Sequence, residues 1–320
     1  MFRIAQVSWV CILVFAAGVA IAAEYPEKTV TFVVPFAAGS ATDTLARVAA
    51  QEITSETKQR IVVDDKPGAS GIIGAQSVAK AAPDGYTVFI TTNTTHAANQ
   101  HLYKQLPYDA LTDFAPVAGL AKGYQIMVVN PHVPAKRVAD FIALAKKSPG
   151  KLSFGEGSSS ARVAVELFQQ MTGTRLNHVP YKSNPLAITD LLGGHIDMMI
   201  VDMPTGLPQV QAGKLTALAV TSKERSPQAP QLPTIDEAGV KGYEMTYWFA
   251  AYVPAKTPQP VIRRLNELLV KAIGTESAKA FFAKNGLVRF TTSPDELAKF
   301  QAAETQKWGR IITSAGIQPE

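Results

Sequence analysis

Two turns of the chain combine glycine with hydroxyl side chains directly in front of an amphipathic segment. The first runs from Pro35 to Asp43 and the second from Gly155 to Arg162. At the start of a helix, free backbone N–H groups and the positive end of the helix dipole can hold a small anion. Ser40 with Asp43 three residues later also predicts a capping box, so the first turn alone favours a plain, well-capped connection.

Arg162 is the unusual residue of the second turn. It falls in the first turn of the expected helix, where the dipole disfavours a cation. A local violation of this kind indicates function, such as contact with a bound anion. An ion pair with Glu166, four residues further on, explains the same arginine equally well.

Two more strand-to-helix junctions are rich in polar side chains. Thr91–His96 supplies hydroxyl and amide groups, which suit a carboxylate held directly or through water, although Thr and Asn also cap helices. In Pro180–Pro185, Asn184 is expected as the N-cap and Pro185 at the first helical position. Tyr181 and Lys182 could reach a ligand there, although an exposed lysine usually makes no specific contact.

The motifs of catalysis and of cofactor binding are missing from the sequence. Gly68–Gly74 has the spacing G-x-x-G-x-x-G and lacks the G-x-G of a dinucleotide turn. Gly150 and Gly213 each precede Lys-Leu, which is not a phosphate loop, and no G-x-S-x-G elbow occurs. The five histidines contain no i, i+4 pair, and the single cysteine lies near the N-terminus. We therefore expect no metal, no cofactor and no enzymatic activity.

The N-terminus has the layout of an export signal. Arg3 is followed by an uncharged stretch that reaches Glu24 and ends in small residues, which predicts a signal peptide over residues 1–23 with cleavage after Ala22 or Ala23. An uncleaved anchor is the alternative, because the run could just span a bilayer of about 30 Å. The only cysteine, Cys11, lies inside this segment, so the exported chain is expected to be soluble, free of thiols and located in the periplasm.

Length and charge limit the classes of partner. A chain of 320 residues predicts two domains of ordinary size once the leader is removed. The formal net charge of +5 is a slight basic excess, and the Lys and Arg residues are scattered rather than clustered. Nucleic-acid binding is therefore not expected.

Short β-rich apolar runs alternate with amphipathic segments of helical length, which is typical of βαβ units around parallel sheets. Helices are expected after Asp43, after Ser160, over Glu276–Lys284 and over Pro294–Ser314. The expected strands are Thr29–Val34, Arg60–Asp64, Thr87–Thr91, Gln125–Val129, Leu152–Phe154, Asn177–Val179, Ile196–Val201 and Ala217–Thr221.

The chain resembles the substrate-binding proteins of the tripartite tricarboxylate transporters, also called the Bug family. The stretches that carry the resemblance are spread over the chain outside the leader, and together they are highly specific. They are Pro35–Asp43, Arg60–Gly74, Val78–Tyr86, Thr95–Ala97, Val179–Lys182, Asp190–Gly194 and Pro233–Gly239.

This resemblance implies a two-domain α/β periplasmic binding protein of type II, a Venus flytrap with a mainly parallel sheet in each domain. Domain 1 would comprise residues 24–124 plus 249–320, and domain 2 residues 125–248. Strands near Gln125–Asn130 and Glu244–Val253 would cross between them. The loops Phe36–Asp43 and Gly157–Arg162 would donate N–H groups to a carboxylate, partly through water.

The candidate ligand-binding residues combine these loops with the polar junctions and with side chains expected to set specificity. They are Phe36, Ala37, Ala38, Gly39, Ser40, Thr42, Asp43, Thr92, Asn93, Thr94, His96, Ser158, Ser159, Ser160, Arg162, Tyr181, Lys182, Asp202 and Trp248.

Two positions depart from the family pattern. The first loop has Gly39-Ser40 where the family has Gly-Gly, and Ser183 replaces a glycine after Val-Pro-Tyr-Lys. Each change restricts the backbone and adds a hydroxyl at the expected cleft, so the ligand could differ from the family's better-known ones. Asp43 either caps Ser40 or faces the cleft, where it could accept a hydrogen bond from a ligand ammonium group or hold water.

The function implied by the resemblance is capture of a small organic carboxylate and its delivery to a membrane transporter. The transporter subunits would be transient partners, and we expect the protein to be a monomer. A sensor that presents its closed form to a receptor uses the same closure and remains an alternative. A periplasmic enzyme acting on such an acid is a second alternative, which the missing catalytic motifs disfavour.

Overall fold

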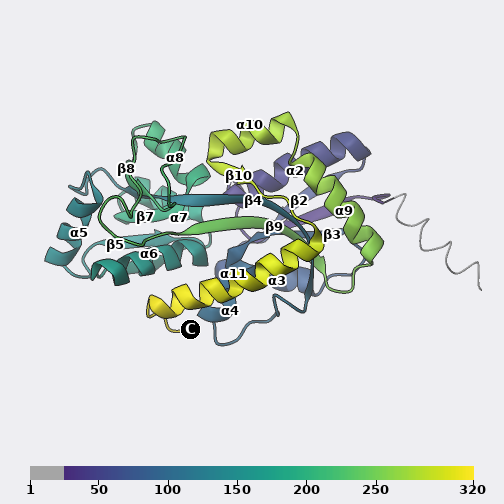
Figure 1. Cartoon of the computed structure of the whole chain (residues 1–320), viewed down its shortest axis with the longest axis horizontal. Coiled ribbons are helices and arrows are strands. Elements are labelled where there is room, and N and C mark those ends of the chain that lie inside the picture. The colour runs from purple at the N-terminus through teal and green to yellow at the C-terminus, as the bar shows by residue number, and fades with distance from the viewer. Residues whose placement is uncertain (1–24) are drawn as a thin grey trace, which may run out of the picture.

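The computed structural model describes residues 25–320 and has two α/β lobes side by side (Figure 1). Two long strands, β4 (Phe114–Val129) and β9 (Thr246–Pro254), run between the lobes. The strand order is β2-β1-β3-β9-β4-β7-β5-β6, and β8 and β10 pair with β4 beside this path. We call the part that contains β1–β3 the first lobe and the part that contains β5–β8 the second lobe.

The first lobe is built on three parallel strands, β1 (Val30–Val34), β2 (Ile61–Asp65) and β3 (Thr87–Thr92). β9 adds to β3 in the antiparallel direction. β1 is apolar except for Thr31 because helices cover both of its faces. Its helical elements are α2 (Ala41–Thr57), η1 (Ala69–Gly71), α3 (Ile72–Ala79), η2 (Thr94–Ala98), α4 (Asn99–Leu102), α9 (Gln259–Ala272) and α10 (Glu276–Asn285).

The second lobe repeats this arrangement with β5 (Ser153–Glu156), β6 (Asn177–Pro180) and β7 (Met198–Asp202), which are parallel. The short antiparallel strand β8 (Thr216–Val220) pairs with β4. Its helices are α5 (Val138–Lys147), α6 (Ser159–Thr172), α7 (Asn184–Leu192) and α8 (Met203–Gln211).

β4 changes partners where it passes from one lobe to the other. Up to Tyr124 it pairs with β9, with β10 (Leu287–Arg289) on its other side. From Gln125 onwards it pairs with β7 and β8. Gly119 and Gly123 allow its neighbours to approach closely, since an added Cβ would meet the Phe290 ring at 2.9 Å and the Tyr247 ring at 2.6 Å. One continuous strand therefore couples the two sheets.

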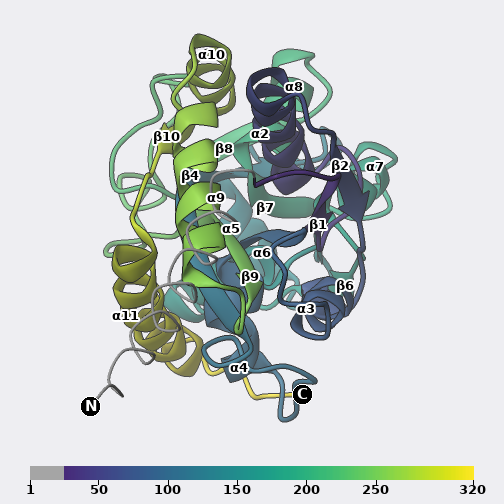
Figure 2. The same cartoon turned by 90° about the vertical axis from the view of Figure 1, so that its right-hand side faces the viewer.

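The longest helix, α11 (Pro294–Ser314), lies along β4 and reaches towards α6 of the second lobe (Figures 1 and 2). A reciprocal capping box between Ser293 and Glu296 starts it. Trp308 and Ile312 on its buried face belong to a hydrophobic core that also contains Phe168 of α6. Within residues 25–320, no helix is both long enough and apolar enough to cross a membrane.

The eight expected strands are present, seven of them with ends shifted by at most two residues, and the expected helix Pro294–Ser314 has the bounds of α11. The first half of β4 is the main omission. Ala115, Ala118, Gly119, Ala121 and Gly123 give it a low β propensity, and tertiary packing overrides that propensity. The expected leader, residues 1–23, lies outside the described residues.

Candidate ligand-binding site

A cavity lies between the lobes at the carboxyl ends of their parallel strands, the edge at which open α/β sheets bind ligands. It encloses about 410 Å³ of space between atoms, part of it open to solvent. Its lining comes from both lobes and from β4 and β9, and consists of Phe36, Ser40, Ala41, Thr42, Thr92, Asn93, Thr94, Gln125, Ser158, Ser160, Asn184, Asp202, Tyr247 and Phe249.

The start of α2 forms the wall in the first lobe. Ser40 is the N-cap, and its Oγ accepts a hydrogen bond from Asp43 N at 3.2 Å. The N–H groups of Ala41 and Thr42, in the first turn, have no acceptor within the helix. Both residues line the cavity. This helix end therefore presents backbone donors and a positive partial charge to a ligand.

The side chain of Asp43 stabilises this loop. Its Oδ2 accepts a hydrogen bond from Gly39 N at 2.8 Å, and its Oδ1 lies 2.7 Å from Arg47 Nε. Burial and the neighbouring Asp43 carboxylate raise the pKa of Asp65 to about 6, against the opposing effect of Arg47. The Asp43 carboxylate thus holds the loop and the Arg47 side chain and does not line the cavity.

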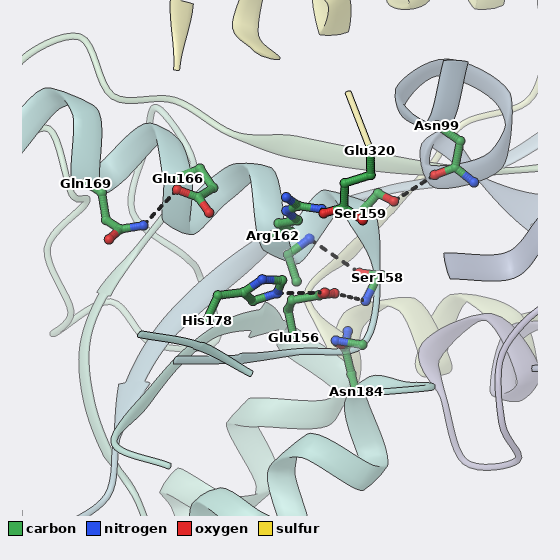
Figure 3. A network of polar contacts seen from close by, with 12 residues as sticks. Asn99, Glu156, Ser158, Ser159, Arg162, Glu166, Gln169, His178, Asn184 and Glu320 are labelled. Atoms are coloured by element: carbon green, nitrogen blue, oxygen red, sulfur yellow. Dashed lines mark hydrogen bonds and ion pairs between the residues drawn. The ribbon is translucent and has the colours of Figure 1, made fainter. Parts of the chain in front are cut away.

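The start of α6 faces the same cavity from the second lobe. Ser158 is the N-cap, and its Oγ accepts from Ala161 N at 3.3 Å. Behind it, the buried Glu156 accepts from Ser158 N at 2.8 Å and lies 3.1 Å from His178 Nε2 (Figure 3). Thr94 Oγ1 donates to Ser160 Oγ at 3.5 Å across the cavity. Two helix N-termini, one from each lobe, therefore meet at one site.

Asn184 and Asp202 complete the wall in the second lobe. Asn184 Oδ1 accepts from Gly157 N at 3.0 Å, and its Nδ2 donates to Asp202 Oδ2 at 2.6 Å. Asp202 is the N-cap of α8, and its Oδ1 accepts from Thr205 N at 3.0 Å. Burial raises the pKa of Asp202, against the lowering effect of these hydrogen bonds.

The strands add one buried donor and an aromatic wall. Asn93 Nδ2 is buried and has no hydrogen-bond partner among residues 25–320, which leaves a donor free at the cavity. Burial raises the pKa of Tyr247 well above its ordinary value, and the nearby Asp202 carboxylate adds to this effect. Phe36 and Phe249 supply apolar surface for the body of a small ligand.

None of the described residues that line the cavity is Lys, Arg or His. A bound anion would therefore be held by backbone N–H groups, hydroxyls and amides. In the part of the chain that the structure describes, no three His, Cys, Asp or Glu side chains are grouped to hold a metal ion.

The structure places part of the expected binding set at the cavity. The members that line it are Phe36, Ser40, Thr42, Thr92, Asn93, Thr94, Ser158, Ser160 and Asp202. Ala37, Ala38 and Gly39 form the outer part of the first turn and are partly or fully exposed.

His96 and Trp248 do not line the cavity. The His96 ring is fully buried and stacks on Tyr252 with 3.9 Å between ring centroids. Trp248 donates from Nε1 to Glu304 of α11 at 3.1 Å. Successive side chains of a strand point to opposite faces, so Tyr247 and Phe249 line the cavity while Trp248 does not.

Four expected residues of the second lobe do not line the cavity either. Tyr181 donates from its hydroxyl to Asp190 at 2.7 Å, and Lys182 is exposed. Ser159 donates to Asn99 Oδ1 at 2.7 Å, and Arg162 NH1 lies 2.6 Å from Glu320 Oε1 (Figure 3). Arg162 therefore forms its ion pair with Glu320 and not with Glu166, whose Oε2 accepts from Gln169 Nε2.

Five lining residues are not among the candidate residues: Ala41, Gln125, Asn184, Tyr247 and Phe249. Of these, Ala41 lies within the expected loop Phe36–Asp43 and Asn184 within the expected polar junction Pro180–Pro185. Asn184 was predicted as the N-cap of α7, but the N-cap is Ser183, which moves Asn184 and its side chain into the first turn. The alternation of side chains along β9 is the signal that could have revealed Tyr247 and Phe249.

Two α/β lobes that share long strands and enclose a polar cavity define a two-domain periplasmic binding protein of type II, which confirms the predicted fold class. A family model described as the tripartite tricarboxylate transporter family receptor matches residues 45–317. The chain therefore belongs to this family, as its motifs predicted, and the members of the family are binding proteins.

Three relatives illustrate the similarity. Protein BugT of Bordetella pertussis is 33% identical over 313 residues, which cover 96% of each chain. The structure of R. palustris Rpa4515 with adipate is 36% identical, covers 92% of this chain and 100% of that chain, and has a TM-score of 0.90. MatC from Rhodopseudomonas palustris with bound malate is 28% identical, covers 90% and 100%, and has a TM-score of 0.85.

Proposed function

We propose that this protein captures a small organic carboxylate in the cavity between its lobes and delivers it to a tripartite tricarboxylate-type membrane transporter. The observation that carries the proposal is the meeting of the α2 and α6 N-termini at one cavity. Both helix ends favour a negative charge. The adipate and malate named with Rpa4515 and MatC are ligands of this chemical kind.

The mechanism is a shift of population towards the closed form. A carboxylate that contacts both helix ends interacts with the closed arrangement better than with an open one, and so favours closure. No covalent step is needed, and we propose that the protein is not an enzyme. Mass spectrometry of the ligand after prolonged incubation should recover it unchanged.

The proposal extends to the organisation of the chain. Residues 1–23 direct export to the periplasm, residues 24–124 plus 249–320 form domain 1, and residues 125–248 form domain 2. The exchange of β4 partners between Tyr124 and Gln125 supports the first boundary. The protein acts as a monomer and meets its transporter transiently.

The test is a thermal-shift screen of the exported chain against mono-, di- and aminocarboxylates, with adipate and malate included. A ligand at one hundred times its Kd should stabilise the protein by about 2.7 kcal/mol, which raises the melting temperature by several degrees. The amides of the same acids serve as uncharged controls and should have little effect. Absence of stabilisation across the whole carboxylate panel would contradict the proposal.

A further inference from the structure

Asp202 brings a negative charge into a cavity that is otherwise suited to an anion. Asp202 is 8% exposed and lines the cavity at the end of β7. Its carboxylate accepts hydrogen bonds from Asn184 Nδ2 and Thr205 N, which are both uncharged. A buried carboxylate without a cationic partner is costly, so something must offset this cost when the cavity closes on a ligand.

The cations nearest to the two loops in sequence are not available for this role. Arg47 pairs with Asp43 and Asp65, and Arg162 pairs with Glu320. Lys182 is exposed and does not line the cavity. Among the described lining residues there is no cation. The N-terminus of α8, which Asp202 caps, supplies only a partial positive charge, so the ligand is the remaining source of a full one.

The capping role of Asp202 does not require this charge. Asn and Ser cap helices about as well as Asp does, and both are neutral. A neutral N-cap would start α8 without placing a buried carboxylate against the ligand. The charge at this position therefore points to recognition as well as to helix capping.

The hydrogen bonds of Asn184 indicate where a positive group of the ligand would lie relative to its carboxylate. One amide side chain, Asn184, bridges Asp202 and Gly157 N, with bonds of 2.6 and 3.0 Å. Gly157 directly precedes the start of α6, where the ligand carboxylate is expected to bind. The cation should therefore lie close to that carboxylate in the ligand, as the ammonium group of a 2-amino acid does.

We propose that Asp202 is a specificity-determining residue, which makes the cavity select 2-aminocarboxylates over unsubstituted monocarboxylates and dicarboxylates of the same length. This inference rests on the proposed function, because it assumes that the α2 and α6 N-termini hold the ligand carboxylate. A second ligand carboxylate near Asp202 would be repelled, whereas an ammonium group would form a charge-assisted hydrogen bond.

The test is calorimetric titration of the exported chain with two matched sets of acids. The four-carbon set is butanoate, 2-aminobutanoate and succinate, and the six-carbon set is hexanoate, 2-aminohexanoate and adipate. In at least one set, the amino acid should bind about tenfold more tightly than each of the other two acids. Asp202→Asn keeps an N-cap and should reduce this preference by about tenfold or abolish it.

Asp190→Asn is the matched control. Asp190 lies on α7 and accepts from Tyr181, away from the cavity lining, so its neutralisation should leave the preference unchanged. Should Asp202→Asn fail to fold, Asp202→Ser provides another neutral N-cap. The preference of the unmodified protein already tests whether the cavity selects 2-aminocarboxylates.

The outcomes separate this inference from the proposed function. Tightest binding of a dicarboxylate or an unsubstituted acid in both sets, or an unchanged preference in Asp202→Asn, would overturn the role of Asp202 and leave carboxylate capture standing. If none of the six acids binds and the broader thermal-shift panel is also silent, the proposed function and this inference fail together. If none of the six binds but another carboxylate on that panel does, only the inference fails.

Discussion

His96 shows how a side chain next to the cavity can serve stability instead of binding. Its ring is fully buried among Phe89, Phe114 and Tyr252. Nδ1 lies 2.9 Å from Thr95 Oγ1, and Nε2 has no partner among the described residues. Burial lowers the pKa of His96 from 6.5 to about 3, so the ring is neutral in the folded protein near neutral pH.

This pKa predicts a loss of stability in acid. Between pH 6.5 and about 3 the unfolded chain binds a proton at residue 96 and the folded chain does not. The contribution of His96 to stability is therefore complete above pH 6.5 and falls by up to about 1.4 kcal/mol per pH unit below it. Urea unfolding of the unmodified protein and of His96→Phe, measured from pH 7 to pH 4, should show a smaller pH dependence in the variant.

The exposed His195 provides the control for this measurement. His195→Gln should retain the pH dependence of the unmodified protein. Equal slopes for His96→Phe and the unmodified protein would show that His96 does not titrate differently on unfolding. The comparison uses slopes, so a change in absolute stability caused by the substitution does not affect it.

At the scale of secondary-structure elements, the loop before α6 fits tightly against the start of α7. A Cβ added to Gly157 would lie 1.9 Å from Ser183 C and 2.1 Å from Asn184 N. Gly157 N also donates to Asn184 Oδ1, which ties the two helix starts together. The position of the α6 N-terminus at the cavity therefore depends on the absence of a side chain at residue 157.

Gly157→Ala should push the two helix starts apart. We expect a loss of about 1–3 kcal/mol of unfolding free energy from overpacking, measured by urea denaturation. We also expect weaker binding of whichever panel acid the unmodified protein binds most tightly, because the donors at α6 move. Calorimetric titration measures this second effect.

Gly193→Ala is the matched control on the same lobe. Gly193 has φ −75° and is exposed, and the nearest atom to its added Cβ is in the exposed His195 side chain, at 3.0 Å. Its replacement should change stability and affinity little. Similar losses in both variants would mean that the close contact at Gly157 has no special role.

The elements that the sequence predicted well are those with a local signal. Ser40 and Ser158 cap α2 and α6 at the two predicted loops, since polar N-caps and apolar periodicity are written into neighbouring residues. Whether Trp248 or its neighbours line the cavity depends instead on which face of β9 meets the cavity. The ion-pair partner of Arg162 is Glu320, which is distant in the sequence, whereas local spacing could indicate only Glu166. Tertiary contacts decide such positions, and a single sequence does not contain them.

At the scale of the whole molecule, several contacts join the lobes around the cavity. Ser159 of α6 donates to Asn99 of α4, and Arg162 of α6 pairs with Glu320 (Figure 3). Glu320 is fixed to the first lobe by two backbone hydrogen bonds, with Leu102 O and Lys104 N. On another side, Gln228 Nε2 donates to Ala283 O of α10 at 2.8 Å. The start of α6 is therefore held by side-chain contacts to the first lobe as well as by β4 and β9.

These contacts predict that the Arg162–Glu320 ion pair favours the closed form without touching the ligand. The pair joins the lobes, and the side chain of Glu320 is 56% exposed, so its contribution should not exceed about 1 kcal/mol. Glu320→Gln should weaken binding of the tightest panel acid by up to about fivefold, mainly through faster dissociation. The difference should shrink at high salt because exposed charges are screened.

Asp140→Asn separates this effect from a general change of charge. It removes the same charge from a pair with Arg137, 2.9 Å apart at the start of α5, and both partners lie in the second lobe. A pair within one lobe is the same in open and closed forms, so this variant should bind with unchanged affinity. Stopped-flow dissociation rates at low and high salt would measure both variants. An equal change of the dissociation rate in the two variants, or no change in Glu320→Gln, would refute a role of the ion pair in closure. A salt-sensitive increase of the dissociation rate in Glu320→Gln alone would support that role. The unpaired Arg162 would then make closure less favourable, since the differential affinity of a ligand for two states includes every contact formed on closing.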